Sequence, residues 1–275
     1  MEDVEGQINN IARFSAPSDS TTISSPRCKK SRASPPMLNI QDPGDFVGTI
    51  ETCKDETNAT ITLSKNLITV KSVLFGGSVL FNFRYRCVPT LSVYKATTLT
   101  VPLKVLRTEL QKFKKSLIIT LDDKFENLTL KALNKNQQII QQSVIKSLHD
   151  EEEIPELGDN LPFDSLVTFK ASSLFDAVPK TIEEKLNVIV NPKSGRKVEM
   201  ITEDDCSISS TFLYPDTGSI KSHYQCYFDK NIALMLRQNM AMTVKLCMGE
   251  DLPLKAIYEF KNARLILFLA PMVNE

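Results

Sequence analysis

The chain has 275 residues, of which 42% are hydrophobic and 24% charged, which is typical of globular proteins and allows two domains with cores of their own. The 33 basic and 33 acidic residues cancel, so a nucleic-acid partner would have to bind a local basic surface. The six cysteines show no CxxC spacing, and no apolar run approaches the roughly 20 residues of a membrane span. We therefore expect reduced, mostly buried thiols in an intracellular protein that does not bind a membrane.

Residues 1–36 are rich in Ser, Thr and Pro and poor in large apolar side chains. Such a segment cannot bury enough surface to offset the entropy of ordering, so we expect a disordered tail. The tail carries the basic cluster Arg27–Arg32, flanked by Ser-Pro at Ser25 and Ser34. This cluster is either a nuclear import signal that phosphorylation could tune or an ordinary solvated charge.

A module of one short amphipathic helix followed by a two-stranded hairpin recurs four times along the chain. In the clearest copy Leu103, Leu106 and Leu110 lie at helical spacing, and Leu117–Leu121 and Asn127–Leu133 follow as strands. The second pair of hairpins follows the first by about 127 residues, which indicates an internal duplication. The expected helices are Pro43–Glu56, Pro102–Lys115, Ser172–Lys185 and Asp229–Met240. The other expected strands are Ala59–Ser64, Leu67–Val73, Ser78–Tyr85, Leu91–Leu99, Asn187–Asn191, Lys197–Ile201, Thr211–Tyr214, Ser219–Phe228, Thr243–Cys247, Leu254–Phe260 and Leu265–Leu269.

The duplication predicts an α+β fold of two topologically similar domains, residues 37–135 and 163–275, each with two helices packed on antiparallel sheets. Residues 136–162 would connect them. This connector contains the acidic run Asp150–Gly158, whose charges, Pro and Gly suit an exposed linker.

The sequence contains no catalytic constellation. The two histidines are His149, just before the acidic run, and His223, in a strand pattern, and neither has a partner at metal-ligand spacing. The acidic run lacks the alternating ligands and central Gly of a calcium loop. We therefore expect a protein that is not an enzyme and that holds no metal and no cofactor.

Basic residues concentrate on the predicted helices. The second helix carries an unmixed basic stripe without interleaved aromatics, which favours contact with a duplex backbone over stacking on single strands. On the third helix, Glu183 and Glu184 balance the lysines, so DNA contact and an ordinary solvated face are equally open there. The candidate DNA-binding residues are Lys104, Arg107, Lys114, Lys115, Lys180, Lys185, Lys230 and Arg237.

Several segments resemble the sliding clamps typified by proliferating cell nuclear antigen. The resemblance covers about residues 37–275 and is strongest over residues 231–275, where the Leu-Ala-Pro ending is fairly specific. The matching segments are Thr243–Leu246, Leu252–Leu254, Ile257–Glu259 and Leu269–Pro271, with Ser172–Phe175 at the start of the second-domain helix.

The resemblance implies a ring of two-domain subunits, a homotrimer or a heterotrimer, whose helices face duplex DNA and which a clamp loader opens. It also implies docking of DNA polymerase and repair proteins through short peptide motifs, in the nucleus or at a viral replication site. The peptide-binding residues that carry over are Leu157, Leu161, Pro162, Pro253, Phe268, Leu269, Ala270 and Pro271.

Three departures from the family pattern leave the exact role open. The first helix is acidic, with Lys54 as its one lysine; the N-terminal tail is extra; and the region around Tyr94 lacks the usual Arg-Cys-Asp. The main expectation is a replicative processivity factor, and the alternative is a subunit of a heterotrimeric DNA-damage checkpoint clamp. A protein-only scaffold and an unrecognised enzyme are the interpretations from other classes.

Overall fold

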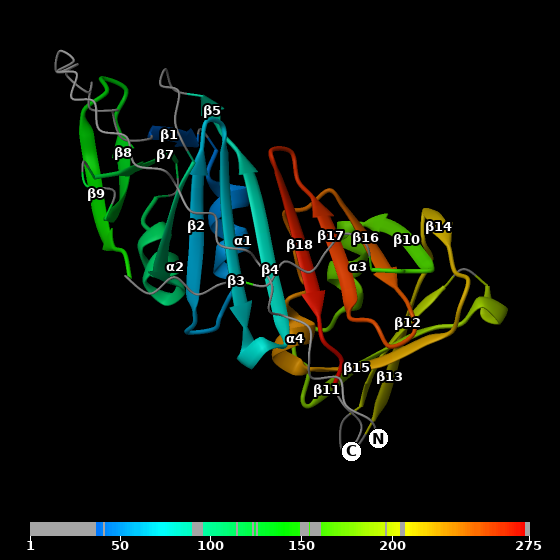
Figure 1. Cartoon of the computed structure of the whole chain (residues 1–275). Helices are drawn as coiled ribbons and strands as arrows, with labels where there is room; N and C mark the ends of the chain where they lie inside the picture. Colours follow the sequence, from blue (N-terminus) through cyan, green and yellow to red (C-terminus); the bar gives the residue numbers. More distant parts are fainter. Residues whose placement is uncertain are drawn as a thin grey trace, which may run out of the picture. The chain divides into compact units, whose positions relative to one another are not determined.

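The computed structural model is built mainly of antiparallel strands, with four short helices in the part of the chain that it describes (Figure 1). That part comprises residues 37–40, 42–89, 96–113, 115–122, 124, 126–148, 154, 161–195, 197–203 and 207–272. The expected tail and its basic cluster lie outside it, so they stay predictions. No described helix is long and apolar enough to cross a membrane.

The helices lie where the sequence places them but end earlier. They are α1 (Gly44–Glu51), α2 (Leu103–Leu110), α3 (Ala171–Ala177) and α4 (Lys230–Leu234). After α2 the chain tightens into a turn in which the Phe113 N–H donates to the Leu110 carbonyl at 2.9 Å, and this turn buries Phe113. A buried residue three positions past Leu110 therefore mimics a further helical turn. Helix α3 ends at Ala177, and the C-cap residue Val178 is extended because Pro179 follows it.

Each helix is followed by an antiparallel hairpin, which confirms the repeated module. The four hairpins are β2 (Asn58–Ser64) with β3 (Leu67–Leu74), β7 (Leu117–Leu121) with β8 (Asn127–Leu133), β11 (Lys185–Val190) with β12 (Val198–Glu203), and β16 (Thr243–Met248) with β17 (Leu254–Glu259). The predicted and observed limits of β7 and β8 coincide.

Three sheets organise the described residues. A nine-stranded sheet has the order β14-β10-β16-β17-β18-β4-β3-β2-β6, a five-stranded sheet β5-β1-β7-β8-β9, and a four-stranded sheet β13-β12-β11-β15. The remaining strands are β1 (Met37–Ile40), β4 (Val79–Arg86), β5 (Val88–Pro89), β6 (Thr97–Pro102), β9 (Ile139–Lys146), β10 (Ser165–Lys170), β13 (Ile208–Leu213), β14 (Thr217–Ser219), β15 (Tyr224–Asp229) and β18 (Ala263–Leu269). The last strand, β18, pairs with β4 and so joins the two halves of the chain in one sheet.

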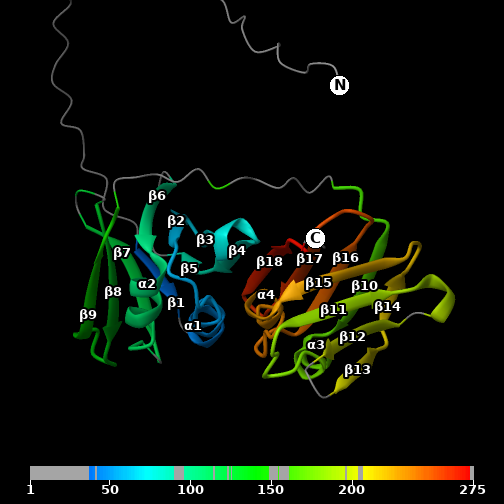
Figure 2. The ribbon, with the colours of Figure 1, turned by 90° about the horizontal axis from the view of Figure 1, so that it is seen from below.

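The main core lies between the nine-stranded sheet and the helices, which Figure 2 shows on one side of that sheet. Alternate residues of β4 and β18, such as Phe81, Phe83 and Leu265, point into this core. We call this side of the sheet the helix face and the opposite side the outer face. A smaller apolar cluster of Cys247, Ile257, Ile266 and Phe268 lies on the outer face.

Three expected segments differ in the structure. Of the expected strand Leu91–Leu99, residues 91–95 lie outside the described residues, and the strand found there is β6, at Thr97–Pro102. The expected strand Ser219–Phe228 begins only at Tyr224, as β15, while Ser219 ends the short strand β14. Gly218 brings β14 against β10, since a Cβ added at Gly218 would lie 2.1 Å from the Leu166 carbonyl oxygen. Strand β9 lies within the range expected to connect two domains, and it pairs with β8. Its exposed, polar-rich pattern hides it from a search for buried alternation. The domain limits themselves stay a prediction.

The described cysteines fit the expectation of reduced, buried thiols. Cys53, Cys87, Cys226 and Cys247 are buried and form no disulfide. Burial raises the pKa of Cys87 and of Cys226 to about 12, so both thiols are protonated at neutral pH. Cys28 and Cys206 lie outside the described residues.

Candidate nucleic-acid interface and peptide-binding surface

The two basic side chains on α2 are both engaged with the end of α1. The Arg107 guanidinium donates to the Cys53 carbonyl oxygen at 2.5 Å, and the Lys104 ammonium forms an ion pair with Glu56. Cys53 follows the C-cap residue Thr52, so Arg107 fixes the chain just beyond the end of α1. These two residues hold α2 against α1, and only the exposed Lys104 remains close to solvent.

Arg237 does the same in the second half of the chain. Its Nη1 donates to the Phe175 carbonyl at 2.9 Å and to the Val178 carbonyl, and its guanidinium lies 4.1 Å from the Phe175 ring centroid. Desolvation lowers the pKa of Arg237 below its ordinary value. In each half, an arginine on or just after the second helix thus bonds carbonyl groups at the end of the first helix or just beyond it. The side chains of Arg107 and Arg237 therefore bond to the protein itself and help to hold the helices together.

The expected basic stripe on α2 is not formed as one helical face. Because α2 ends at Leu110, Lys115 lies beyond the helix, where it is exposed, and Lys114 lies outside the described residues. Of the other candidates, Lys185 begins β11 and its ammonium lies 5.1 Å from the Tyr227 ring centroid. Lys180 and Lys230 are both exposed.

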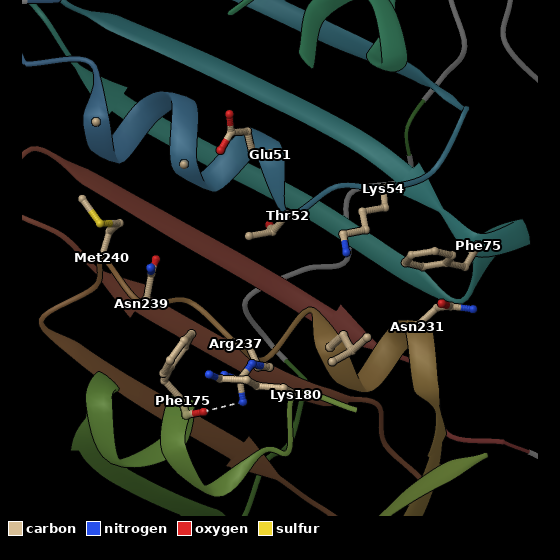
Figure 3. A pocket seen from close by; sticks show the side chains of 13 residues that line it. Glu51, Thr52, Lys54, Phe75, Phe175, Lys180, Asn231, Arg237, Asn239 and Met240 are labelled. Atoms are coloured by element: carbon tan, nitrogen blue, oxygen red, sulfur yellow. Dashed lines mark hydrogen bonds between the residues drawn. The ribbon is translucent and has the colours of Figure 1, made fainter. Parts of the chain in front are cut away.

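A hollow of about 500 Å³ lies on the helix face between α1 and the α3–α4 pair. Lys54, from the end of α1, and Arg237 reach toward it from opposite sides, and Lys180 lies on its wall (Figure 3). Lys54 is not among the residues predicted from the sequence, although its place at the end of an amphipathic helix was a usable signal. We call Lys54, Lys180 and the neighbouring Lys230 the inner lysines.

Two acidic residues that follow α1 are bonded within the chain. The Asp55 carboxylate accepts the backbone N–H of Phe75, and Glu56 accepts from Lys104, which lowers the pKa of Glu56. Burial, reinforced by Asp42, raises the pKa of Asp45. Glu51, by contrast, is exposed and lines the hollow together with Lys54.

A buried glutamine fixes α1 relative to the segment after α4. Gln238 is 2% exposed, and its side-chain amide donates to Thr52 Oγ1 at 3.2 Å and to the Met235 carbonyl at 2.9 Å. A buried amide with both bonds made holds its neighbours in one geometry. The inner lysines on either side of the hollow are thereby carried by a rigid frame.

The outer apolar cluster receives the chain that follows the acidic run. Leu161 and Phe163 pack against it, and the buried Lys255 ammonium lies 5.0 Å from the Phe268 ring centroid. Leu269, one residue further along β18, points to the other face and is fully buried in the main core. Phe268 is itself 5% exposed, so a ligand on the outer face would meet the cluster through the partly buried Leu80 and Phe163 that pack against it.

The other residues expected to bind peptides lie near the same end of the sheet. Ala270 and Pro271 are half-buried, and Ala270 N–H donates to the Ser78 carbonyl at 2.8 Å. Pro271 and Met272 line a hollow of about 270 Å³ together with residues of β15. Pro253 is half-buried, Pro162 is exposed, and Leu157 lies outside the described residues.

Two strands leave apolar side chains on unpaired sheet edges. Strand β9 is at one end of the five-stranded sheet, and Ile140 and Val144 on it are 66% and 54% exposed. Strand β13 is at one end of the four-stranded sheet, and Ile208 and Phe212 on it are 71% and 43% exposed. Open apolar edges are a liability unless another strand covers them.

Among the described residues, no group of His, Cys, Asp and Glu could hold a metal ion. His223 lines the hollow beside Pro271. His149 is outside the described part of the chain.

Comparison with known proteins finds similarity in structure only. No protein-family model and no curated protein sequence matches the chain. The chain is similar to the PCNA2–PCNA3 complex from Sulfolobus tokodaii, with a TM-score of 0.70 and 14% identity over 86% of this chain and 98% of that one. It is also similar to the proliferating cellular nuclear antigen of Entamoeba histolytica, with a TM-score of 0.73 and 14% identity over 88% of this chain and all of that one. The chain therefore has the α+β fold of the PCNA-type sliding clamps, as the sequence predicts.

Proposed function

We propose that this protein is a subunit of a DNA sliding clamp, which encircles duplex DNA and tethers replication or repair enzymes to it. The observation that carries the proposal is the likeness to two PCNA structures over nearly their full length. The inner lysines support it, because they place exposed positive charge on the helix face, where phosphates would approach. Contacts of this kind are electrostatic and independent of base sequence, as sliding requires.

We further propose that subunits join edge to edge, β9 of one against β13 of the next. Both edges carry exposed Ile residues and lie on the same chain, so a single kind of subunit can pair head to tail. A head-to-tail interface generates a ring when its rotation closes. Pairing would cover Ile140, Val144, Ile208 and Phe212 and would satisfy the free backbone groups of both strands.

Replacing Ile140 by Lys on β9 is expected to convert the assembled protein to monomers, because pairing would then bury an uncompensated charge. Light scattering at several concentrations measures the mass, which should be a multiple of 30.9 kDa for the unaltered protein and about 30.9 kDa for the variant. Met242→Lys is the matched control, since Met242 is also exposed but lies off both edges. An Ile140→Lys protein with unchanged mass would rule out this edge.

The clamp function itself is tested by comparing how long the protein stays on circular and on linear DNA. Protein loaded on closed circular duplex DNA should stay bound through gel filtration and should be released when one restriction cut linearises the circle. The reason is that an encircling protein can leave only by sliding over an end. Equal retention on circular and linear DNA would indicate ordinary binding, and no retention with an active loader present would contradict the proposal.

A second candidate is a subunit of a ring made from different chains, such as a heterotrimeric DNA-damage checkpoint clamp. It is favoured by the likeness to a complex of two different PCNA chains and by the acidic composition of the first helix. A persistent monomer in the mass measurement, with partners required for retention on DNA, would support this candidate. A self-assembled ring would support the replicative role. The nucleus, or a viral replication site, is the location proposed for either.

Enzyme docking is proposed for the outer cluster around Phe268 and the hollow beside Pro271. An aromatic or aliphatic side chain of a short partner motif buried there would contribute roughly 1.5–3 kcal/mol. The backbone N–H groups of Ala270 and Met272 donate to the Ser78 and Tyr227 carbonyls, which supports a role for residues 270–272 in holding a bound peptide. DNA polymerase, repair proteins and a clamp loader are the partners proposed.

A further inference from the structure

The outer face of the nine-stranded sheet becomes strongly basic at the end nearest the β17–β18 turn. A hollow of about 340 Å³ opens there, and Arg84 and Arg86 of β4, Arg264 of β18 and Lys261 of the turn line it. Among the described residues that line it, Glu259 is the one carboxylate. Four cations against one anion leave the hollow with excess positive charge.

Two of the three arginines that line this hollow form no side-chain hydrogen bond or ion pair with a group that the structure describes. Arg264 Nε lies 3.1 Å from Glu259 Oε1, and both side chains are about half exposed, at 49% and 47%. Arg84 and Arg86 are exposed, and their side chains form no ion pair or hydrogen bond with any residue that the structure describes. Two guanidinium groups, each able to bind a carboxylate through two parallel N–H bonds, are therefore available.

The basic hollow is continuous with the proposed docking cluster. Arg264, Ile266 and Phe268 are alternate residues of β18 and share the outer face, so Arg264 and Phe268 are about 13 Å apart along the strand. On the neighbouring strand β4, Arg84 is opposite Arg264, and Leu80 is opposite Phe268. The same two strands thus carry an apolar end and a basic end within the reach of about four extended residues.

We infer that the partner segment docking on this face has two parts, an apolar-aromatic anchor for the Phe268 cluster and an acidic stretch for the Arg84–Arg86 hollow. The inference deepens the proposed function and rests on it for the anchor. A peptide fits better than a nucleic acid, because the basic hollow adjoins an apolar cluster on the same two strands, which an apolar side chain of a peptide would cover. The acidic stretch would supply partner selection and faster association.

The test is fluorescence anisotropy with three synthetic peptides that share one anchor, Gln-Ala-Ala-Leu-Ala-Ala-Phe-Phe. The glutamine peptide extends the anchor by four glutamines. The two glutamate peptides carry four glutamates instead, one before the anchor and the other after it. At about 50 mM salt, one of the glutamate peptides should bind roughly fivefold to tenfold more tightly than the glutamine peptide, and this advantage should disappear at about 500 mM salt.

The variant Arg84→Glu/Arg86→Glu should lose this preference while its affinity for the glutamine peptide stays unchanged, which also shows that it is folded. A Lys65→Glu/Lys193→Glu protein makes the same change in net charge at exposed turn lysines and should keep the preference. Equal affinity for all three peptides, or a preference that survives the arginine changes, would overturn the inference.

Other occupants give different results. The chain's own acidic run would occupy the arginines if the preference for a glutamate peptide emerged only after that run was neutralised. The neutralised protein carries Asn or Gln in place of Asp150, Glu151, Glu152 and Glu153. If the unaltered protein bound an oligothymidine, the arginine variant did not, and neither preferred a glutamate peptide, the hollow would be a nucleic-acid surface. Both results would overturn the inference. Failure of every anchor peptide to bind, with retention on circular DNA intact, would overturn it and leave the clamp standing.

Discussion

Charge reversal of the three inner lysines, Lys54→Glu/Lys180→Glu/Lys230→Glu, is expected to lower the affinity for duplex DNA by at least about tenfold at low salt. Each of these side chains is exposed, and Lys54 and Lys180 line the hollow on the helix face. The slope of log K against log salt should become shallower by about 0.9 for each phosphate that the variant no longer neutralises. Anisotropy of a labelled duplex, measured over a salt series, gives both quantities.

The matched control reverses three exposed lysines in turns, Lys65, Lys124 and Lys193. It makes the same change in net charge, so a general electrostatic effect would weaken both proteins equally. If the affinity for DNA falls in the inner-lysine variant but not in the control variant, the DNA lies on the helix face. Equal slopes for the two variants would contradict the proposed interface, while unchanged solution mass in both would show that assembly is intact.

Replacing Arg237 by Ala is expected to destabilise the protein by about 2–3 kcal/mol, whether or not DNA is present. The substitution removes hydrogen bonds from a cation to the Phe175 and Val178 carbonyls and leaves the end of α3 without its partner. It also removes the stacking of the guanidinium on the Phe175 ring. Urea unfolding followed by circular dichroism measures the change in the free energy of unfolding.

Arg86→Ala is the control for this change, because Arg86 is an exposed arginine without an ion pair among the described residues. It should alter the free energy of unfolding by less than about 0.5 kcal/mol. Arg107→Ala should resemble Arg237→Ala, since Arg107 bonds the Cys53 carbonyl at the end of α1. If Arg237→Ala unfolded like the unaltered protein but bound DNA more weakly, Arg237 would be a DNA-binding residue.

The bonds made by the arginines explain why charge on a helix is an incomplete guide to a binding surface. In the sequence, Lys104, Arg107 and Arg237 are polar-face residues of amphipathic helices, and nothing local distinguishes them from Lys180 or Lys230. Which basic side chain meets the end of a helix depends on how two helices pack. Arg107 bonds Cys53, which is 54 positions away in the sequence, and Arg237 bonds Phe175, which is 62 positions away. The inner lysines remain available for DNA, because none of them forms an ion pair within the described part of the chain.

Local patterns were sufficient for the elements that have one buried side or a tight turn. Strands β7 and β8 have their predicted limits because the buried residues of β7 and the largely buried residues of β8 are separated by a polar turn. The four helix–hairpin modules and the α+β class follow from the same periodicities. Helix ends were less well predicted, since the buried Phe113 continues the spacing of α2 through a turn that is not helical.

What the sequence determined by itself was therefore the four helix–hairpin modules, the α+β class and the resemblance to sliding clamps. The tertiary structure decided which strands are edges, which cations are free, and that Arg84 and Arg264 lie side by side although 180 residues separate them. Local sequence determines hydrophobic periodicity, whereas edges, faces and neighbours arise from pairings between distant segments, such as β4 with β18. A surface built from such pairings has no signature in either strand alone.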